Sequence, residues 1–361
     1  MKKIVGVIMV LLTLTACYQT PEQARKKLAE LNIEYNQDNC YERALQGDTL
    51  VVDLFLAAGI EPGCVILGAA QASNLELVKK SLAKKPNLNT DLSKQALVMA
   101  ANEGDSEVVQ LLLKKGANPS YSSLVAAVQG EHIEITKILL DKGANPSRDS
   151  VNQQEVNQYR YLISGMNYSP LATAVSKENT DIIQLLLSKN VEVNDGENGE
   201  SISLISAVQK GNLDIVKLLL EKGANPNSTP DNRFSYGGSS PLNIAVNNGH
   251  TEIVKLLLDN KAKLNDGENG ESSSLISAVQ KDNLDIVKLL LEKGANPNDG
   301  KNGTSQSLIT AIQRNNPEIV KALLEKGANP NANDSYRSPL RYASRKPEIE
   351  AILVQYGAQR S

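Results

Sequence analysis

Aromatic side chains are scarce in this sequence of 361 residues. They make up 4% of the chain, with no Trp and two Phe, so we expect no single large core built on aromatic rings. The hydrophobic content of 41% is nevertheless that of a folded protein, and it excludes an intrinsically disordered chain.

Groups for catalysis or metal binding are also few. The two histidines, His132 and His250, each follow a predicted turn between two helices, and we interpret both as structural residues. No zinc-ligand spacing, phosphate-binding loop or G-x-S-x-G motif occurs. We therefore expect that the protein is not an enzyme and that it has no cofactor and no metal site.

Excess basic charge is missing as well. The chain has 38 Lys and Arg against 41 Asp and Glu, a net charge of −3. A surface that binds nucleic acid normally needs basic side chains to displace counterions from the phosphates. We therefore expect no nucleic-acid partner.

The N-terminal apolar run, Ile4–Leu14, is too short to span a membrane as a stable helix. With Met1-Lys2-Lys3 before it and small residues after it, the run is typical of a secretory signal peptide over residues 1–16. Leu14-Thr15-Ala16-Cys17 resembles the bacterial lipobox, which implies cleavage before Cys17 and acylation of its thiol and new amine. An ordinary signal peptide followed by a coincidental Cys is the alternative.

Tyr18 follows the lipobox where an Asp would favour inner-membrane retention, so the resemblance implies a lipoprotein of the outer membrane that faces the periplasm. Three residues, Tyr18 to Thr20, separate Cys17 from a helical stretch that starts at Pro21. The folded part is therefore expected to lie close to the bilayer.

Cys40 and Cys64 are the remaining cysteines. An exported, oxidising location permits a disulfide between them, and both lie near the start of a predicted helix in neighbouring repeats. Two small buried hydrophobic residues are the alternative.

One block of ten residues, Leu218–Asn227 (L-L-L-E-K-G-A-N-P-N), recurs without change at Leu289–Asn298. Leucines with Glu-Lys favour a helix, Gly223 supplies the left-handed residue after its last turn, and Pro226 prevents continuation. Gly294 and Gly327, the next two such glycines, are 33 residues apart. A helix end that recurs at this spacing indicates a repeat protein.

Each unit has the same predicted order of elements. In one unit, a short helix at Ser203–Lys210 is followed by a turn at Gly211-Asn212 and a second helix at Leu213–Lys222. A polar finger then leads to the next unit, and Asn198-Gly199 in such a finger is typical of a hairpin turn.

These motifs resemble the ankyrin repeat, whose units read T-P-L-H-x-A and later I-V-x-L-L-L-x-x-G-A-N-P-N. Ser240-Pro241-Leu242-Asn243-Ile244-Ala245 matches the first motif, and Gly249-His250 matches the family's turn. The resemblance implies an all-α ankyrin-repeat solenoid of about ten repeats over residues 37–361. Residues 17–36 would form the lipidated N-terminus and a short capping helix, with inserts at 148–167 and 228–239.

Three predicted helix exits lack glycine. Asn190 tolerates the left-handed conformation, whereas Lys85 and Lys261 should each destabilise their repeats by about 1 kcal/mol. We expect the stack to be weakest beside those two lysines.

The inserts carry the candidate partner-binding residues, because Tyr, Phe and Arg offer a large contact area with polar groups at protein interfaces. The alternative is that their rings pack onto neighbouring helices. The first insert contributes Tyr159, Arg160 and Tyr161, and the second contributes Arg233, Phe234 and Tyr236.

The two fingers that begin at Asp195 and Asp266 read D-G-E-N-G-E, which lacks the length and spacing of a calcium loop. We interpret them as acidic hairpin tips. Glu197 and Glu268 at these tips would favour a basic patch on a partner, although a solvated finger explains them equally well.

The resemblance implies a monomeric protein that binds a protein partner on the concave face formed by fingers and first helices. Ankyrin-repeat lipoproteins are similar to immunity proteins against periplasm-acting toxins of the lipase type, and this is the first functional hypothesis. An envelope scaffold or adaptor for an endogenous periplasmic protein is the second.

Overall fold

The computed structural model describes residues 20–147, 169–196, 199–229, 239–264, 273–300, 304–332 and 338–359. Every regular element within these ranges is an α-helix, which confirms the predicted all-α class. None of these helices is long and apolar enough to cross a membrane. The chain divides into two compact units, residues 1–192 and 193–361, which we describe separately.

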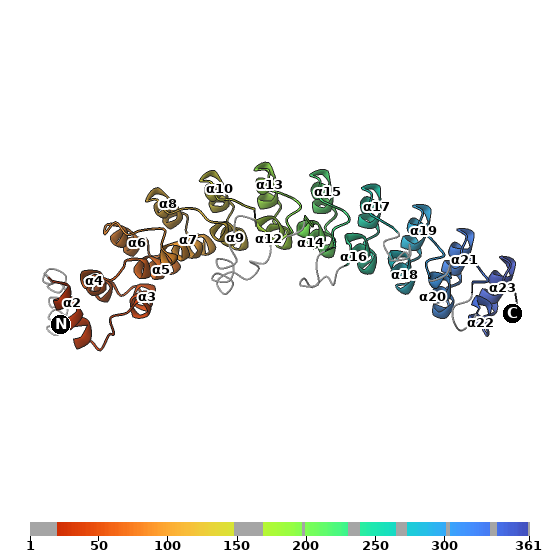
Figure 1. Ribbon diagram of the computed structural model, residues 1–361, viewed down its shortest axis with the longest axis horizontal. Coiled ribbons are helices and arrows are strands. Elements are labelled where there is room, and N and C mark those ends of the chain that lie inside the picture. The colour runs from red at the N-terminus through yellow and green to blue at the C-terminus, as the bar shows by residue number, and fades with distance from the viewer. Residues whose placement is uncertain are drawn as a thin grey trace, which may run out of the picture. The chain divides into compact units, whose positions relative to one another are not determined.

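The described part of unit 1 contains the helix α2 and five helix pairs (Figure 1). First helices pack on first helices and second helices on second helices, so each unit has two layers. The helices are α2 (Pro21–Glu30), then α3 (Gln37–Leu45) with α4 (Thr49–Ala57), α5 (Gly63–Gln71) with α6 (Leu75–Leu82), α7 (Asp91–Glu103) with α8 (Ser106–Lys114), α9 (Tyr121–Gln129) with α10 (Ile133–Asp141), and α12 (Pro170–Ser176) with α13 (Thr180–Ser188).

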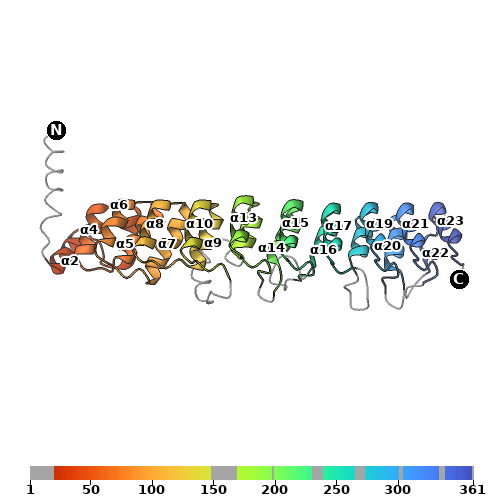
Figure 2. The same ribbon diagram turned by 90° about the horizontal axis from the view of Figure 1, so that it is seen from above.

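Among its described residues, unit 2 contains five further pairs with the same layering, which Figure 2 shows from a second direction. Its helices are α14 (Ile202–Lys210) with α15 (Leu213–Glu221), α16 (Pro241–Asn248) with α17 (Thr251–Asp259), α18 (Ser273–Gln280) with α19 (Leu284–Glu292), α20 (Gln306–Arg314) with α21 (Pro317–Glu325), and α22 (Pro339–Tyr342) with α23 (Pro347–Gln355). Helix α14 starts one residue earlier than predicted because Ser201 caps it by accepting a hydrogen bond from the Leu204 N–H.

The second helices share one way of starting. In most pairs an Asn or Asp before the helix accepts a hydrogen bond from the backbone N–H three residues later, which satisfies one of the unpaired N–H groups of the first turn. These caps are Asp48, Asn74, Asp105, Asn179, Asn212, Asn283 and Asn316. His132 and His250 occupy the same position without a side-chain cap bond.

The core of each unit is built from the apolar stripe of the second helices against the first helices. In α15, Ile215, Val216 and Leu219 are at most 3% exposed. Their spacing of one, three and four residues places all three on one face of the helix. The core is therefore aliphatic and repeated, as the scarcity of aromatic residues requires.

The helix exits have the backbone conformation that the sequence predicts. Gly223, Gly294 and Gly327 have φ angles of 90°, 95° and 91°. The three exits without glycine are left-handed as well, with φ of 52° at Lys85, 55° at Asn190 and 66° at Lys261. The prediction that two lysines occupy a conformation disfavoured for residues with a Cβ atom is confirmed.

Helix α2 covers the free end of the first repeat. The guanidinium of Arg25 donates to the Ala58 carbonyl oxygen at 3.2 Å, and the Tyr35 hydroxyl donates to the same oxygen at 3.1 Å. The guanidinium also lies 4.7 Å from the centre of the Tyr35 ring, which stacks on Phe55. The stack of Arg25, Tyr35 and Phe55 thus packs α2 against α4.

Candidate protein-binding surface

The residues predicted to contact a partner lie outside the described ranges. This holds for both inserts, for the finger-tip glutamates and for the cysteine of the predicted lipid anchor, so these assignments stay predictions. The residues are Tyr159, Arg160, Tyr161, Arg233, Phe234, Tyr236, Glu197, Glu268 and Cys17. What the structure defines is the framework from which the fingers project.

The root of the first D-G-E-N-G-E finger is fixed by its leading aspartate. Asp195 accepts hydrogen bonds from the Ser203 backbone N–H at 3.1 Å and from the Ser203 hydroxyl at 2.5 Å. The Gly196 N–H also donates to the Glu200 carbonyl at 2.7 Å. Asp195 therefore belongs to the root of the finger, and only the residues beyond it can form an acidic tip.

The finger before α20 repeats this arrangement in a more buried setting. Asp299 is 1% exposed and accepts hydrogen bonds from the backbone N–H and the hydroxyl of Ser307. Burial raises the pKa of Asp299 to about 6, and the hydrogen bonds from Ser307 offset part of that rise. This carboxyl group has a structural role, because both of its oxygens accept hydrogen bonds from Ser307 in the first turn of α20.

A ladder of asparagines joins successive repeats of unit 2. The last Asn of each repeat block donates its side-chain N–H to the backbone carbonyl of the helix-exit residue in the next repeat. Its side-chain oxygen accepts a hydrogen bond from the backbone N–H of the residue two positions after that exit residue. For Asn298 the partners are the Gly327 carbonyl at 3.0 Å and the Asn329 N–H at 2.8 Å. The other rungs are Asn194 with Gly223 and Asn225, Asn227 with Lys261 and Lys263, and Asn331 with Gly357 and Gln359.

The ladder sets a fixed spacing between repeats in unit 2. In unit 1, Ser120 and Ser147 stand where the ladder would need Asn. A hydroxyl cannot reproduce the paired donor and acceptor of an amide. Asn89 has the same place in its repeat, but among the described residues it forms no such rung, so Asn at this position is required for the ladder but does not by itself predict it.

The two histidines connect neighbouring repeats, as structural residues would. The His132 Nε2 atom lies 2.9 Å from the Asn102 carbonyl oxygen. A Cβ atom on Gly104 would lie 2.5 Å from the His132 ring, and one on Gly211 would lie 2.7 Å from the His250 ring. Glycine is therefore needed at a turn wherever the following repeat begins its second helix with histidine.

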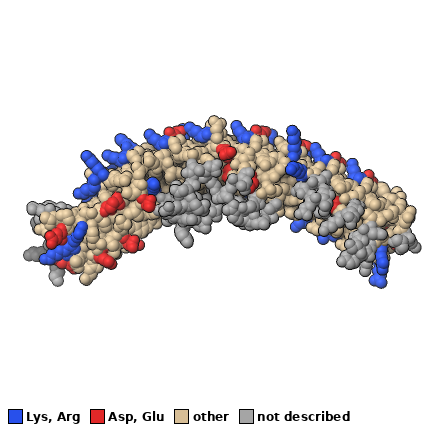
Figure 3. Space-filling model, in the orientation of Figure 1, with Lys and Arg blue, Asp and Glu red and all other residues tan. Residues whose placement is uncertain are grey.

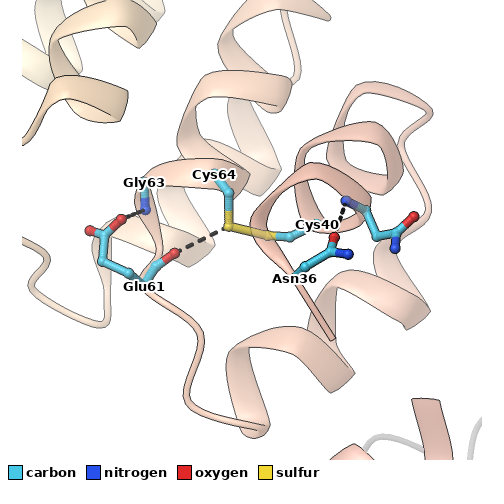
Figure 4. Close-up of a disulfide and its surroundings, with 6 residues drawn as sticks. Asn36, Cys40, Glu61, Gly63 and Cys64 are labelled. Carbon is cyan, nitrogen blue, oxygen red and sulfur yellow. Dashed lines mark hydrogen bonds between the residues drawn. A yellow bond between two sulfur atoms is a disulfide. The ribbon is translucent and has the colours of Figure 1, made fainter. Parts of the chain in front are cut away.

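Cys40 on α3 and Cys64 on α5 form a disulfide, with their Cα atoms 5.9 Å apart (Figure 4). The bond joins the first helices of the first two repeats and closes a loop of 24 residues. Further along the same two helices, a Cβ atom on Gly68 would lie 2.5 Å from the Tyr41 carbonyl oxygen. A covalent bond and a close backbone approach thus hold α3 against α5.

Within the described residues, no group of three His, Cys, Asp or Glu side chains is placed to hold a metal ion. The described framework instead consists of stacked helix pairs, finger roots and inter-repeat hydrogen bonds. Ankyrin-repeat family models match the chain at residues 66–150, 151–230, 228–301 and 290–343.

The chain belongs to the ankyrin-repeat family.

Solved ankyrin structures are similar to parts of this chain. An ankyrin repeat domain from Acinetobacter baumannii is 28% identical over 53% of this chain and 98% of its own, with a TM-score of 0.47. The ankyrin repeat domain of Bcl-3, a member of the IkappaB protein family, is 24% identical over 66% of this chain and 99% of its own, with a TM-score of 0.48. The human ASB11 ankyrin repeat domain is 23% identical over 73% of this chain and 99% of its own, with a TM-score of 0.38. No curated protein matches the chain.

The family models and the stacked helix pairs confirm the ankyrin fold predicted from the recurring block. Ankyrin repeats bind protein partners and are generally non-catalytic, because their stacked units offer an extended surface without an enclosed active site. The protein is accordingly a protein-binding module.

Proposed function

We propose that this ankyrin array is an immunity protein, tethered to the bacterial envelope by lipid on Cys17, which binds and neutralises a lipase-type toxin that acts in the periplasm. The observation that carries the proposal is the position of the first described helix. Helix α2 begins at Pro21 with Thr20 as its cap, three residues after Tyr18.

Acyl chains on Cys17 would hold the array next to the bilayer. A link of three residues spans at most about 10 Å. Two or more acyl chains give stable anchoring, since each buried methylene contributes about 0.8 kcal/mol. A binder anchored at this distance meets an enzyme that attacks the same lipid surface.

The candidate contacts are the aromatic and arginine side chains of the two inserts, together with the glutamates of the finger tips. The duplicated repeats of unit 2 support this choice, since they are nearly identical in sequence. Residues 195–227 and 266–298 differ at two positions, Ile202/Ser273 and Gly211/Asp282. Uniform repeats supply spacing, whereas the inserts differ from one another and can discriminate between partners.

A competition assay tests the proposal. A strain that lacks this gene is grown beside sibling cells that deliver lipase-type toxins, and it is complemented with the wild-type protein or with Cys17→Ala. We expect the deletion strain to be killed, the wild-type gene to restore survival, and the Cys17→Ala protein to protect poorly because it is not held at the membrane.

Survival of the deletion strain beside toxin-delivering cells would contradict the immunity function. Capture of an endogenous periplasmic protein by the full chain, purified in detergent, would in that case identify the protein as an envelope scaffold.

A further inference from the structure

A pocket of about 290 Å³ opens between the first helices α3, α5 and α7 of unit 1. Leu67, Leu92 and Met99 supply its apolar lining, and Leu67 and Met99 are 9% and 6% exposed. Sites for drug-sized ligands usually measure about 300–1,000 Å³. An open pocket at the lower limit of that range suits one side chain of a protein better than a cofactor.

The polar side of the pocket is preorganised. The Tyr41 hydroxyl donates to the Gln71 side-chain oxygen at 2.5 Å, which joins α3 to α5 across the pocket. Partial burial and then the negative charge of Glu42 raise the pKa of Tyr41, so its hydroxyl stays protonated.

The Cys40–Cys64 disulfide and the close approach of α3 and α5 fix the walls of the pocket. Cys64 lines the pocket and is bonded to Cys40, and Gly68 allows the backbones of α3 and α5 to approach closely. A binding pocket with fixed walls loses little conformational entropy when it is filled.

The charge around the pocket is acidic. Asp38 lines it, Glu42 lies one turn further along α3, and both are exposed. Neither carboxylate forms an ion pair within the described part of the chain. Figure 3 shows Asp and Glu side chains along the lower edge of the part that Figure 1 labels α3 and α5.

The first helices of unit 2 carry net charge of the opposite sign to that of α3, α5 and α7. Helices α3, α5 and α7 carry Asp38, Glu42, Asp91 and Glu103 against Arg43 and Lys94, and Arg43 is paired with Asp48 at 3.5 Å. Helices α14, α16, α18, α20 and α22 carry Lys210, Arg314 and Arg341 and no acidic residue. Among the first helices compared, the excess of acidic residues is thus confined to those that line the pocket.

We propose that this pocket binds one large apolar side chain, of the size of Leu, Met or Phe, that lies between Lys or Arg residues in a segment of the partner protein. This inference rests on the proposed protein-binding function and names the chemistry of the segment. The apolar side chain would fill the space against Leu67 and Met99, while the flanking cations would meet Asp38 and Glu42.

Labelled synthetic peptides test the pocket directly. The first peptide has one Phe between pairs of Arg, the second has Ala in place of Phe, and the third has Glu in place of Arg. Each is titrated with the full chain in detergent by fluorescence anisotropy. We expect the first peptide to bind at least about tenfold more tightly than the other two, with an affinity that falls as salt is added. Equal affinities for the three peptides would overturn the proposal.

Two variants locate the binding. The double variant Asp38→Asn with Glu42→Gln should lower the affinity for the first peptide about tenfold. The control variant, Glu76→Gln with Glu107→Gln, removes the same charge from α6 and α8 and should leave this affinity unchanged. Gln95→Trp, which fills the pocket from α7, should also weaken it. If Gln95→Trp fails to fold, the comparison of the two charge pairs decides, and equal affinities for them would reject this site.

The outcome is distinguishable from that of the competition assay. Peptides that do not discriminate, together with a protected wild-type strain, would reject the pocket and leave the immunity function standing. Peptides that bind as expected, together with an unharmed deletion strain, would support the pocket and reject the immunity function.

Discussion

Lys85 and Lys261 take the left-handed exit position that glycine takes in most repeats. Neither exit is relieved by a change of conformation, since φ is 52° and 66°. The neighbouring exits Gly223 and Gly294 have the same turn without a Cβ atom. The two lysines therefore keep a local strain that a single substitution can remove.

Replacement of Lys261 by Gly should raise the free energy of unfolding by up to about 1 kcal/mol, because the strain at the exit disappears. Part of the gain is offset by the greater freedom of Gly in the unfolded chain. The measurement is the denaturant midpoint of the full chain. The reverse change, Gly223→Lys, is the matched control and should lower the midpoint; an unchanged midpoint in both variants would show that exit strain does not limit stability.

Asp299 should make the stability of unit 2 depend on pH. Its folded pKa of about 6 lies above the ordinary value of 3.8, so the folded state retains the proton more strongly than the unfolded state. This contribution is fully present below pH 3.8 and is lost as pH rises to about 6. The loss is about 3 kcal/mol at most.

The Asp299→Asn variant keeps a neutral acceptor for Ser307 at every pH. As pH rises from 4 to 6, we expect the melting temperature of the variant to increase relative to that of the wild-type protein. Melting curves across this range, recorded by circular dichroism, give the comparison. Parallel pH profiles for the two proteins would contradict the assignment.

The turns at Gly211 and Asp282 each match the side chain that faces them from the next repeat, and we call this matching the turn rule. Gly211 has φ of 76° and faces the His250 ring of the next repeat. Asp282 takes the same position in the duplicated unit, with φ of 55°, and receives the Arg314 guanidinium at 2.8 Å and 2.5 Å. Arg314 holds the pKa of Asp282 below its ordinary value. At Asp282, which no histidine faces, an ion pair with Arg314 thus accompanies the left-handed turn.

This rule predicts unequal effects for two opposite substitutions. Gly211→Asp should destabilise the protein by about 2 kcal/mol or more, because the new side chain meets the His250 ring and the backbone is left-handed. Asp282→Gly should change stability by less than about 1 kcal/mol, since relief of strain and loss of an exposed ion pair oppose each other. Thermal unfolding of both variants measures this, and equal losses would refute the rule.

Helix starts and exits could be predicted from sequence because their determinants are local. The leucine run, Gly223 and Pro226 lie within ten residues of one another, and so do each Asn or Asp cap and the helix that it starts. The His250–Gly211 contact, the Asn298 rung and the Asp299 anchor could not be predicted in the same way. Their partners lie in another repeat or across a finger, where only the fold brings them together.

Unit 2 differs from unit 1 in the way its repeats are joined. Within the described residues the asparagine ladder has four rungs, at Asn194, Asn227, Asn298 and Asn331, and each rung exchanges two hydrogen bonds with the next repeat. Repeat arrays gain cooperativity from such nearest-neighbour contacts. We therefore expect unit 2 to unfold as a cooperative block.

Asn298→Ser removes both hydrogen bonds of one rung and should lower stability by about 1 kcal/mol. Asn298→Asp keeps the acceptor for the Asn329 N–H but loses the donor, so it is expected to be intermediate. Native-state hydrogen exchange distinguishes the two, because the Asn329 amide loses protection in the Ser variant while the Ala328 amide, which donates to the Leu323 carbonyl, does not. Full protection of Asn329 in the Ser variant would show that the rung is not formed.

The candidate site was predictable only as a contrast with the regular repeats. Aromatic residues and arginines in the inserts are exceptional in a chain with 4% aromatic content, and that contrast singles them out. The pocket beside Tyr41 escaped prediction, because Tyr41, Leu67 and Met99 come from three different repeats.

The proposed function requires that the repeats provide a rigid spacing and that the inserts make the main contacts with the partner, to which the pocket of unit 1 adds one side chain. The most direct test is the dissociation constant of the captured partner for the wild-type chain and for Tyr161→Ala combined with Phe234→Ala, with Tyr356→Ala in the last repeat as the control. We predict that the double variant weakens binding by at least about tenfold while its melting temperature and the affinity of the control stay unchanged. An unchanged dissociation constant in the double variant would contradict the claim.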